Sequence, residues 1–276
     1  MGTIGQHVTM RLEDDRTITK SPPERRRAAR AILGIAEEFQ LIAFRCADSH
    51  MHLLVPGPKS QASEFARRAK IRVGKGLKLD VPFNPARYRP VGSQYHLSNA
   101  FRYLFTQEQH HGTDCDPTFD ASNLPDLLGM RVVGAHTQRH VQAYLPRVTR
   151  HELVEYLGCD PSDGPLILEA LPDAAAAALA LPSLEGQRAD AVDARCGAVR
   201  VGLRVYGAAE LGRALSITRQ CVFRLSRRDV SPAVLKAVDL QWRMRSTFMA
   251  NGREQARLAL PPTQHRSRRA AQVAAE

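Results

Sequence analysis

Cysteine is scarce in this chain, and no two cysteines form a Cys-x-x-Cys pair. An odd and scattered set of cysteines argues against a disulfide framework and against a zinc ribbon. We therefore interpret the cysteines as small buried apolar residues in a reducing cytoplasm. They are Cys46, Cys115, Cys159, Cys196 and Cys221.

Long hydrophobic runs are also missing. The longest apolar stretch runs from Ala174 to Leu181, which is too short to cross a bilayer. The first twenty residues carry several charges, a composition that predicts no signal peptide. We expect a soluble protein of the cytoplasm, associated with the nucleoid and without a membrane partner.

Acidic residues are few compared with basic ones. Lys and Arg number 39 against 28 Asp and Glu, which gives a formal net charge of +11. A surplus of this kind favours a polyanionic partner, because each neutralised phosphate releases a counterion. The alternative is that the chain is Arg-rich without binding nucleic acid. Net charge bears on binding and gives no information about the fold.

The hydrophobic pattern of the first 112 residues predicts strands over 7–12, 41–47, 50–55 and 83–91. It predicts helices over 21–39, 63–77 and 95–109, the first of them capped by Ser21. This order is a split βαβ pattern, and we expect an α+β, ferredoxin-like sandwich of the HUH endonuclease type.

The remainder is predicted to be helical. Thr149 and Glu152 form a capping box before a helix that ends at Gly158. The Ala-rich stretch 172–182, and the residues up to 195, are expected to form a low-complexity linker or a loosely held helix. A short strand is expected over 200–206. The predicted divisions are a nuclease domain over 1–112, a helical connecting region over 113–195, a helix-turn-helix region over 196–260 and a basic, disordered tail over 261–276.

His50-Met51-His52 lies at the start of a predicted strand. Because side chains alternate along a strand, both imidazoles share one face and Met51 points into the core. Two imidazoles on one face can bind one divalent ion if a third ligand comes from elsewhere. A His-x-His pair with a purely structural role is the alternative.

Tyr103 and Gln107 can supply the missing groups. At positions i and i+4 of a helix they lie one above the other. A helix packed over the histidine face would bring an amide oxygen to the metal and a phenol oxygen next to it. Metal coordination of a phosphate would favour attack by the phenol and give a 5′-phosphotyrosine. Tyr95 and Asn99 form a competing pair with the same spacing.

Residues 7 to 112 resemble the single-tyrosine HUH transposases, most closely the REP-associated tyrosine transposases. The resemblance rests on His7-Val8-Thr9, on His50-Met51-His52-Leu53-Leu54, and on Arg102-Tyr103 with Gln107 four residues later. It favours Tyr103 over Tyr95. This chain differs from the family at Ala47-Asp48-Ser49 before the first histidine, and at Gln107-Glu108 after the tyrosine.

The resemblance implies Mg²⁺ or Mn²⁺ as cofactor and single-stranded DNA, with a hairpin near the cleavage point, as substrate. It also implies a possible homodimer, in which the tyrosine helix serves either its own protomer or the partner. Within the nuclease domain, the residues expected to contact DNA are basic: Arg67, Arg68, Lys70 and Arg102.

Residues 207 to 227 have the spacing of a helix-turn-helix. Gly212 allows the two helices to approach, and Thr218 can cap the second helix. Ser216 stands where glycine is usual in the turn. A helical hairpin with a solvated basic face is the alternative. The residues expected to contact DNA are Arg219, Gln220, Arg224, Arg227 and Arg228.

The sequence thus predicts a metal-dependent transposase that nicks and rejoins single-stranded DNA. A DNA-binding regulator on the same scaffold, without catalysis, is the first alternative. A nucleotide hydrolase with tandem histidines is the second, and it would need a third alternating histidine where this chain has Leu54.

Overall fold

A computed structural model describes residues 3–47, 49–107 and 116–252. The described chain is a mixed α+β structure, mostly helical, with one four-stranded antiparallel sheet. Its sheet region contains, in order, β1 (Gly5–Arg11), α1 (Pro22–Ala36), β2 (Ala43–Cys46), β3 (His50–Pro56), α2 (Lys59–Leu77), β4 (Arg87–Val91) and α3 (Gln94–Phe105).

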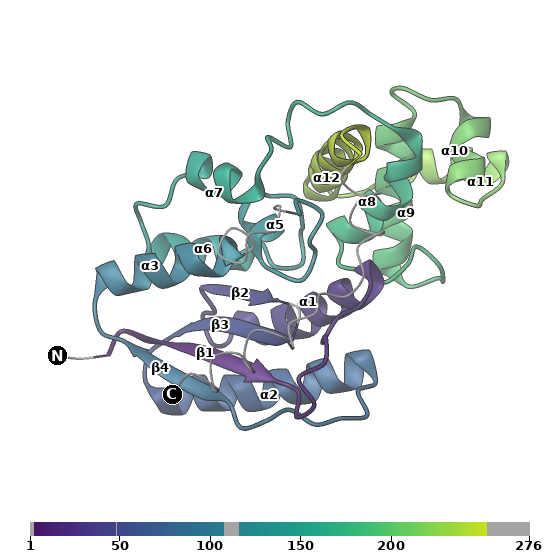
Figure 1. Cartoon of the computed structure of the whole chain (residues 1–276). Coiled ribbons are helices and arrows are strands. Elements are labelled where there is room, and N and C mark those ends of the chain that lie inside the picture. The colour runs from purple at the N-terminus through teal and green to yellow at the C-terminus, as the bar shows by residue number, and fades with distance from the viewer. Residues whose placement is uncertain (1–2, 48, 108–115, 253–276) are drawn as a thin grey trace.

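The strands lie in the order β2-β3-β1-β4, with antiparallel pairing between all neighbours (Figure 1). In the central pair, Thr9 of β1 lies opposite His52 of β3. On the other side of β1, His7 lies opposite Arg89 of β4. Each such cross-strand pair shares a face of the sheet, so this register decides which residues surround the histidines.

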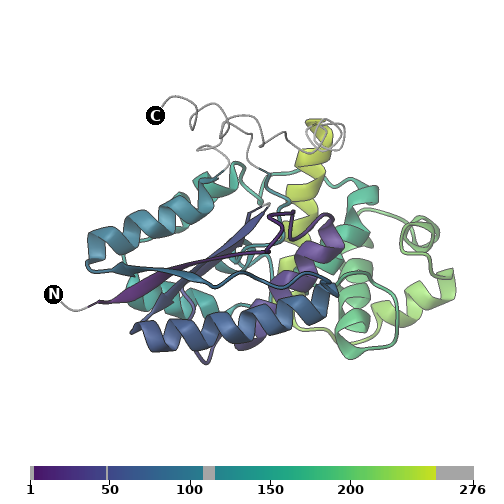
Figure 2. The same cartoon turned by 60° about the horizontal axis from the view of Figure 1, so that its bottom comes forward.

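Each face of the sheet is covered by different helices (Figure 2). Val8, Met10 and Leu53 pack with α1 and α2 in one hydrophobic core. Leu54 and Val91 point the other way and pack with α3 and with helices that follow it. The strand alternation therefore gives α3 the face that carries His50 and His52.

Two helix ends differ from the sequence prediction. Helix α3 ends at Phe105, where the Thr106 hydroxyl donates to the Arg102 carbonyl at 3.0 Å, which is earlier than predicted. Residues 108 and 109, the last of the predicted helix, lie outside the described residues. Ser21 occupies the N-cap position of α1, but its side chain makes no capping hydrogen bond. The hydrophobic pattern located both helices correctly, but it did not give the last residue of α3 or the capping bond of α1.

Helices form the remainder of the described chain: α5 (Leu124–Leu127), α6 (His136–Tyr144), α7 (Arg150–Leu157), the 3₁₀ turn η1 (Leu168–Ala170), α8 (Leu171–Ala178), α9 (Ala189–Gly202), α10 (Ala208–Ala214), α11 (Arg219–Ser226) and α12 (Pro232–Ala250). The Thr149 half of the predicted capping box is confirmed, because its hydroxyl accepts from the Glu152 amide at 3.2 Å and Gly158 is the C-cap. The Glu152 carboxylate instead accepts from the Tyr156 hydroxyl. The short strand predicted over 200–206 was wrong, since α9 continues to Gly202.

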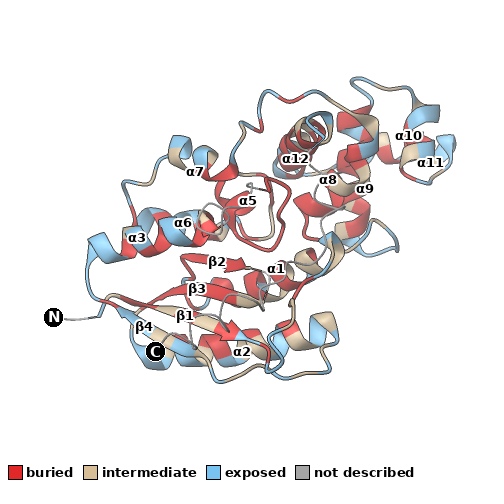
Figure 3. Cartoon of the chain, in the orientation of Figure 1, coloured by how far each residue is buried: buried red, intermediate tan, exposed pale blue. Residues whose placement is uncertain are grey.

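The Ala-rich segment forms the core helix α8, where the sequence predicted either a low-complexity linker or a loosely held helix. Five consecutive alanines of α8, from 174 to 178, are buried between α9 and α12 (Figure 3). Small side chains let neighbouring helices approach closely, so an alanine run can be interior without large apolar groups. The tail over 261–276 lies outside the described residues.

Buried charges join the sheet region to the C-terminal helices. Asp120 lies between Arg26 of α1, at 3.2 Å, and Arg245 of α12, at 2.7 Å. Both arginines also pair with Asp173 of α8. In the part of the chain that the structure describes, none of the helices has the length and apolar character needed to cross a membrane.

Candidate active site

The two histidines of β3 share one face, as the alternation predicts. Their ring centroids are 4.5 Å apart in an edge-on arrangement. Met51, between them, is fully buried in the core on the α1 and α2 side. The strand therefore holds both imidazoles under α3.

His7 is a third histidine of this site, and the sequence pattern had not assigned it a role there. Its Nε2 lies 2.9 Å from Nδ1 of His52. The alternation of strand 7–12 was the signal that could have found it, because His7 and Thr9 share a face and Thr9 is paired with His52. Placing His7 next to His52 also requires the register between β1 and β3, which the sequence does not give.

The surroundings keep the paired imidazoles neutral. Burial, followed by the neighbouring His50 and His7, lowers the pKa of His52 to about 2. Burial and the nearby Arg89 lower the pKa of His7 to about 4. A neutral imidazole has one nitrogen lone pair available, which is the form that binds metals.

Tyr103 lies directly beside this pair. Its ring centroid is 5.7 Å from that of His52 and 6.1 Å from that of His7. The side chain is 36% exposed, so a substrate can reach the phenol. Tyr95, in the first turn of α3, is 78% exposed and makes no ring contact with these histidines among the described residues. The geometry therefore favours Tyr103.

Gln107 follows the end of α3 and is 2% exposed. Neither its Oε1 nor its Nε2 has a hydrogen-bond partner, and the same holds for Nε2 of the buried His52. Buried polar atoms normally have partners, and leaving one unsatisfied costs about 1–3 kcal/mol. These orphaned atoms, an amide oxygen and an imidazole nitrogen, are of the donor types that a divalent cation accepts.

The usual metal-binding side chains do not form a complete site here. Within residues 3–47, 49–107 and 116–252, no three His, Cys, Asp or Glu side chains are arranged to hold a metal ion. A divalent ion bound by His50 and His52 would need a third donor of another type, and the sequence predicts the Gln107 amide oxygen for that place.

Arg102 precedes the tyrosine and is exposed. Its Nη2 lies 3.5 Å from Oε1 of Glu152 on α7. A hydrogen bond to Tyr156 of α7, together with Glu152, raises the pKa of Arg102. An ion pair this exposed contributes little to stability, so a phosphate near Tyr103 would compete with these two partners for the guanidinium.

The basic residues expected on α2 lie in the other layer of the sheet region. Arg67 pairs with Glu64 at 2.7 Å, and Arg68 pairs with Glu38 at 2.5 Å. Lys70 donates to the Asn84 carbonyl at 2.5 Å. The structure therefore does not bring these three cations to the histidine face, because α2 covers the opposite face of the sheet.

Helices α10 and α11 are joined by a tight turn. A Cβ at Gly212 would lie 2.9 Å from the Ile217 carbonyl oxygen, so glycine permits this approach. The Thr218 hydroxyl accepts from the Cys221 amide at 3.1 Å and caps α11. The polar residues predicted to contact DNA are all exposed: Arg219, Gln220, Arg224, Arg227 and Arg228.

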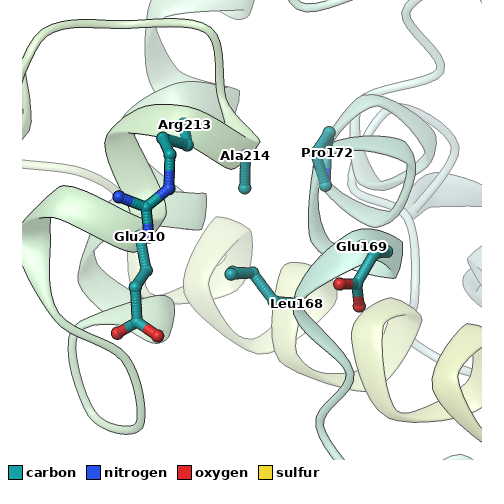
Figure 4. A pocket seen from close by; sticks show the side chains of 6 residues that line it. All are labelled: Leu168, Glu169, Pro172, Glu210, Arg213 and Ala214. Carbon is teal, nitrogen blue, oxygen red and sulfur yellow. The ribbon is translucent and has the colours of Figure 1, made fainter.

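An open pocket of about 520 Å³ lies between η1, the start of α8, and α10 (Figure 4). Glu169, Glu210 and Arg213 are among the side chains that line it. None of the residues predicted for catalysis or metal binding lies there, so this pocket is separate from the histidine face.

Comparison with known proteins gives no relative: no family model, no curated protein and no solved structure matches the chain.

Proposed function

We propose that this protein is a metal-dependent strand-transfer enzyme that nicks and rejoins single-stranded DNA through a 5′-phosphotyrosine. The observation that carries the proposal is the exposed Tyr103 side chain beside the buried imidazole of His52 and the half-buried imidazole of His7. The strand order β2-β3-β1-β4, with α1 and α2 on one face, is that of a ferredoxin-like sheet, which supports the resemblance to HUH transposases.

In the proposed reaction, the Tyr103 oxygen attacks the phosphorus of a phosphodiester and its phenol proton passes to water. A new O–P bond forms, the bond from phosphorus to the 3′ oxygen breaks, and that oxygen leaves as a 3′-hydroxyl after taking up a proton. Rejoining is the reverse, with a 3′-hydroxyl attacking the phosphotyrosine and restoring the phenol. The bond energy is conserved, so both directions use one site.

His50, His52 and Gln107 would hold the divalent cation, Mg²⁺ or Mn²⁺. When bound, the ion supplies electrostatic stabilisation of the negative charge that develops on the phosphate. His7 accepts from Nδ1 of His52 and so directs the Nε2 lone pair of His52 to the cation. Arg102 adds a positive charge beside the tyrosine.

Helices α10 and α11 support a second DNA contact in this proposal. Their turn, the Thr218 cap and the exposed basic side chains of α11 suit a helix-turn-helix. In this role α11 binds DNA next to the cleavage site, and cleavage itself belongs to the sheet region.

The test is a covalent adduct assay. The protein is mixed with Mn²⁺ and a pool of labelled single-stranded hairpins, then run on a denaturing gel. We expect wild type to form an adduct, Tyr103→Phe to lose it, and the matched control Tyr95→Phe to keep it.

His50→Ala, or EDTA with wild type, should remove the adduct as well. DNA binding by wild type with no adduct under any metal would reject the enzyme and favour the non-catalytic regulator. An adduct that persists in Tyr103→Phe would place the nucleophile elsewhere.

A further inference from the structure

Two arginines of the edge strand β4 point toward the site. In the antiparallel register, Arg89 lies opposite His7 and Arg87 lies opposite Thr9. Tyr88, between them, packs against the core on the α1 and α2 side. Both arginines therefore stand on the histidine face, and both are exposed.

These two cations have no protein partner in the described chain. Neither Arg87 nor Arg89 forms a hydrogen bond or ion pair with the residues that the structure describes. On the opposite layer, by contrast, Arg67 and Arg68 are each paired with a glutamate. A side chain that is unpaired and exposed can bind an anion without first breaking an internal contact.

The strands of the sheet and helix α3 carry no carboxylate of their own. The strands β1 to β4 and helix α3 contain no Asp or Glu, and the carboxylate that contacts α3 at Arg102 is Glu152 of α7. The strands do contain, besides the two arginines of β4, Arg11 opposite His50 in the β1–β3 register. An excess of positive charge concentrates polyanions at a surface. The expected ligand is therefore a phosphate chain.

The two edges of the sheet differ in how they are covered. At β2, the Asn123 side chain accepts from the Phe44 amide at 2.9 Å and donates to the Ile42 carbonyl at 3.1 Å. The Cys46 amide also donates to the Ala121 carbonyl at 2.8 Å. At the other edge, β4 pairs with β1 and with no further strand among the described residues (Figure 1). We therefore take the β4 edge as the side from which a long substrate approaches the histidine face.

We propose that Arg87 and Arg89 form a phosphate-binding track for single-stranded DNA, which leads the strand across β4 to Tyr103. The proposal rests on the proposed function. Residues i and i+2 of a strand are about 7 Å apart, a spacing at which two guanidinium groups contact successive phosphates of an extended strand. Contacts of this kind position the backbone and read no sequence.

The experiment measures binding without chemistry. All proteins carry Tyr103→Phe and are kept in EDTA, and the probe is a fluorescein-labelled, unstructured DNA oligonucleotide titrated at several NaCl concentrations. Arg87→Ala with Arg89→Ala is compared with Arg27→Ala with Lys75→Ala. The control removes the same charge at exposed positions of α1 and α2, on the opposite layer.

We expect the β4 double variant to weaken binding for every sequence tested. The slope of log affinity against log salt should fall in magnitude by about 1.4, at ~0.7 for each phosphate that the variant no longer neutralises. The control pair should keep the wild-type slope. Equal slopes for the β4 variant and wild type, or equally weakened binding in both double variants, would overturn the track.

Two further arms identify the nucleic acid. A duplex of the same sequence should lose little affinity on the β4 substitutions. An equal loss of affinity for duplex, or tighter binding of the RNA version, would overturn the assignment to single-stranded DNA.

Failure of the proposed function is separable from failure of the track. Loss of binding in the β4 variant, when wild type forms no adduct, rejects only the chemistry. Adduct formation with unchanged binding in the β4 variant rejects only the track.

Discussion

The contact between His7 and His52 decides which nitrogen of His52 can bind a cation. In the tautomer that the proposed function requires, Nδ1 of His52 donates to Nε2 of His7 across 2.9 Å, and Nε2 of His52 keeps its lone pair without a protein partner among the described residues. A hydrogen bond of this kind fixes both the tautomer and the ring orientation of a metal-binding histidine. Under the proposed function, His7 is a positioning residue, which would contact the ligand His52 and not the metal.

His7→Ala should lower the affinity for Mn²⁺ by about 10- to 100-fold, the usual effect of losing such an outer partner. His7→Gln, which can still accept a hydrogen bond, should recover part of this affinity. Calorimetric titration with Mn²⁺ measures both, and the exposed His151→Ala is the control. Unchanged Mn²⁺ affinity in His7→Ala would show that His52 needs no such support.

At this scale the sequence predicted local relations and missed the non-local ones. The common face of His50 and His52 follows from strand alternation alone, so it could be predicted. The approach of His7 to His52 depends on the β1–β3 register, and no local pattern encodes that register. The same holds for Arg89, whose place beside the site comes from the β1–β4 pairing.

Among the elements, α2 and α8 show why a helix pattern does not give a helix its place. The periodicity of α2 correctly marked Arg67 as outward-facing, but only the sheet topology decides that α2 lies away from the histidines. In α8, alanines carry too weak an apolar signal to predict a core position, and yet they are buried against α9 and α12. The position of α2 and the burial of α8 both depend on packing partners that are distant in sequence.

The turn between α10 and α11 holds Ser216 at a φ of 53°, in the left-handed region where a side chain is unfavourable. Ser216→Gly should relieve this and raise the free energy of unfolding by about 1 kcal/mol. Thermal or urea denaturation measures the change. Ser226→Gly, at the last residue of α11, is the matched control and should lower stability. A lower stability in Ser216→Gly would mean that the serine side chain contributes more than the strain costs.

For the whole molecule, the buried charges around Asp120 hold the sheet region against the C-terminal helices. Arg26 comes from α1 and Arg245 from α12, and two carboxylates, Asp120 and Asp173 of α8, each pair with both arginines and so link elements far apart in sequence. A buried charge left without its partner is strongly destabilising. These bonds join residues on either side of the predicted division after residue 112.

Asp120→Ala should lower the free energy of unfolding by about 3–5 kcal/mol, because two buried guanidinium groups lose a carboxylate. Asp120→Asn, which keeps the size and one acceptor, should cost less. Urea denaturation gives both values. Asp239→Ala is the control, since Asp239 pairs with Arg243 at 3.0 Å in a partly exposed contact worth less than about 1 kcal/mol. Equal effects of Asp120→Ala and Asp239→Ala would contradict this account.

The most direct test of the central claim is to locate the covalent bond. The adduct formed by wild-type protein with single-stranded DNA and Mn²⁺ is trimmed with nuclease, digested with trypsin and sequenced by tandem mass spectrometry. Cleavage after Arg87, Arg102 and Arg131 separates residues 88–102, which contain Tyr88 and Tyr95, from residues 103–131, which contain Tyr103 alone. We expect the nucleotide on the fragment that begins at Tyr103. A nucleotide on residues 88–102, or the absence of any adduct, would contradict the account.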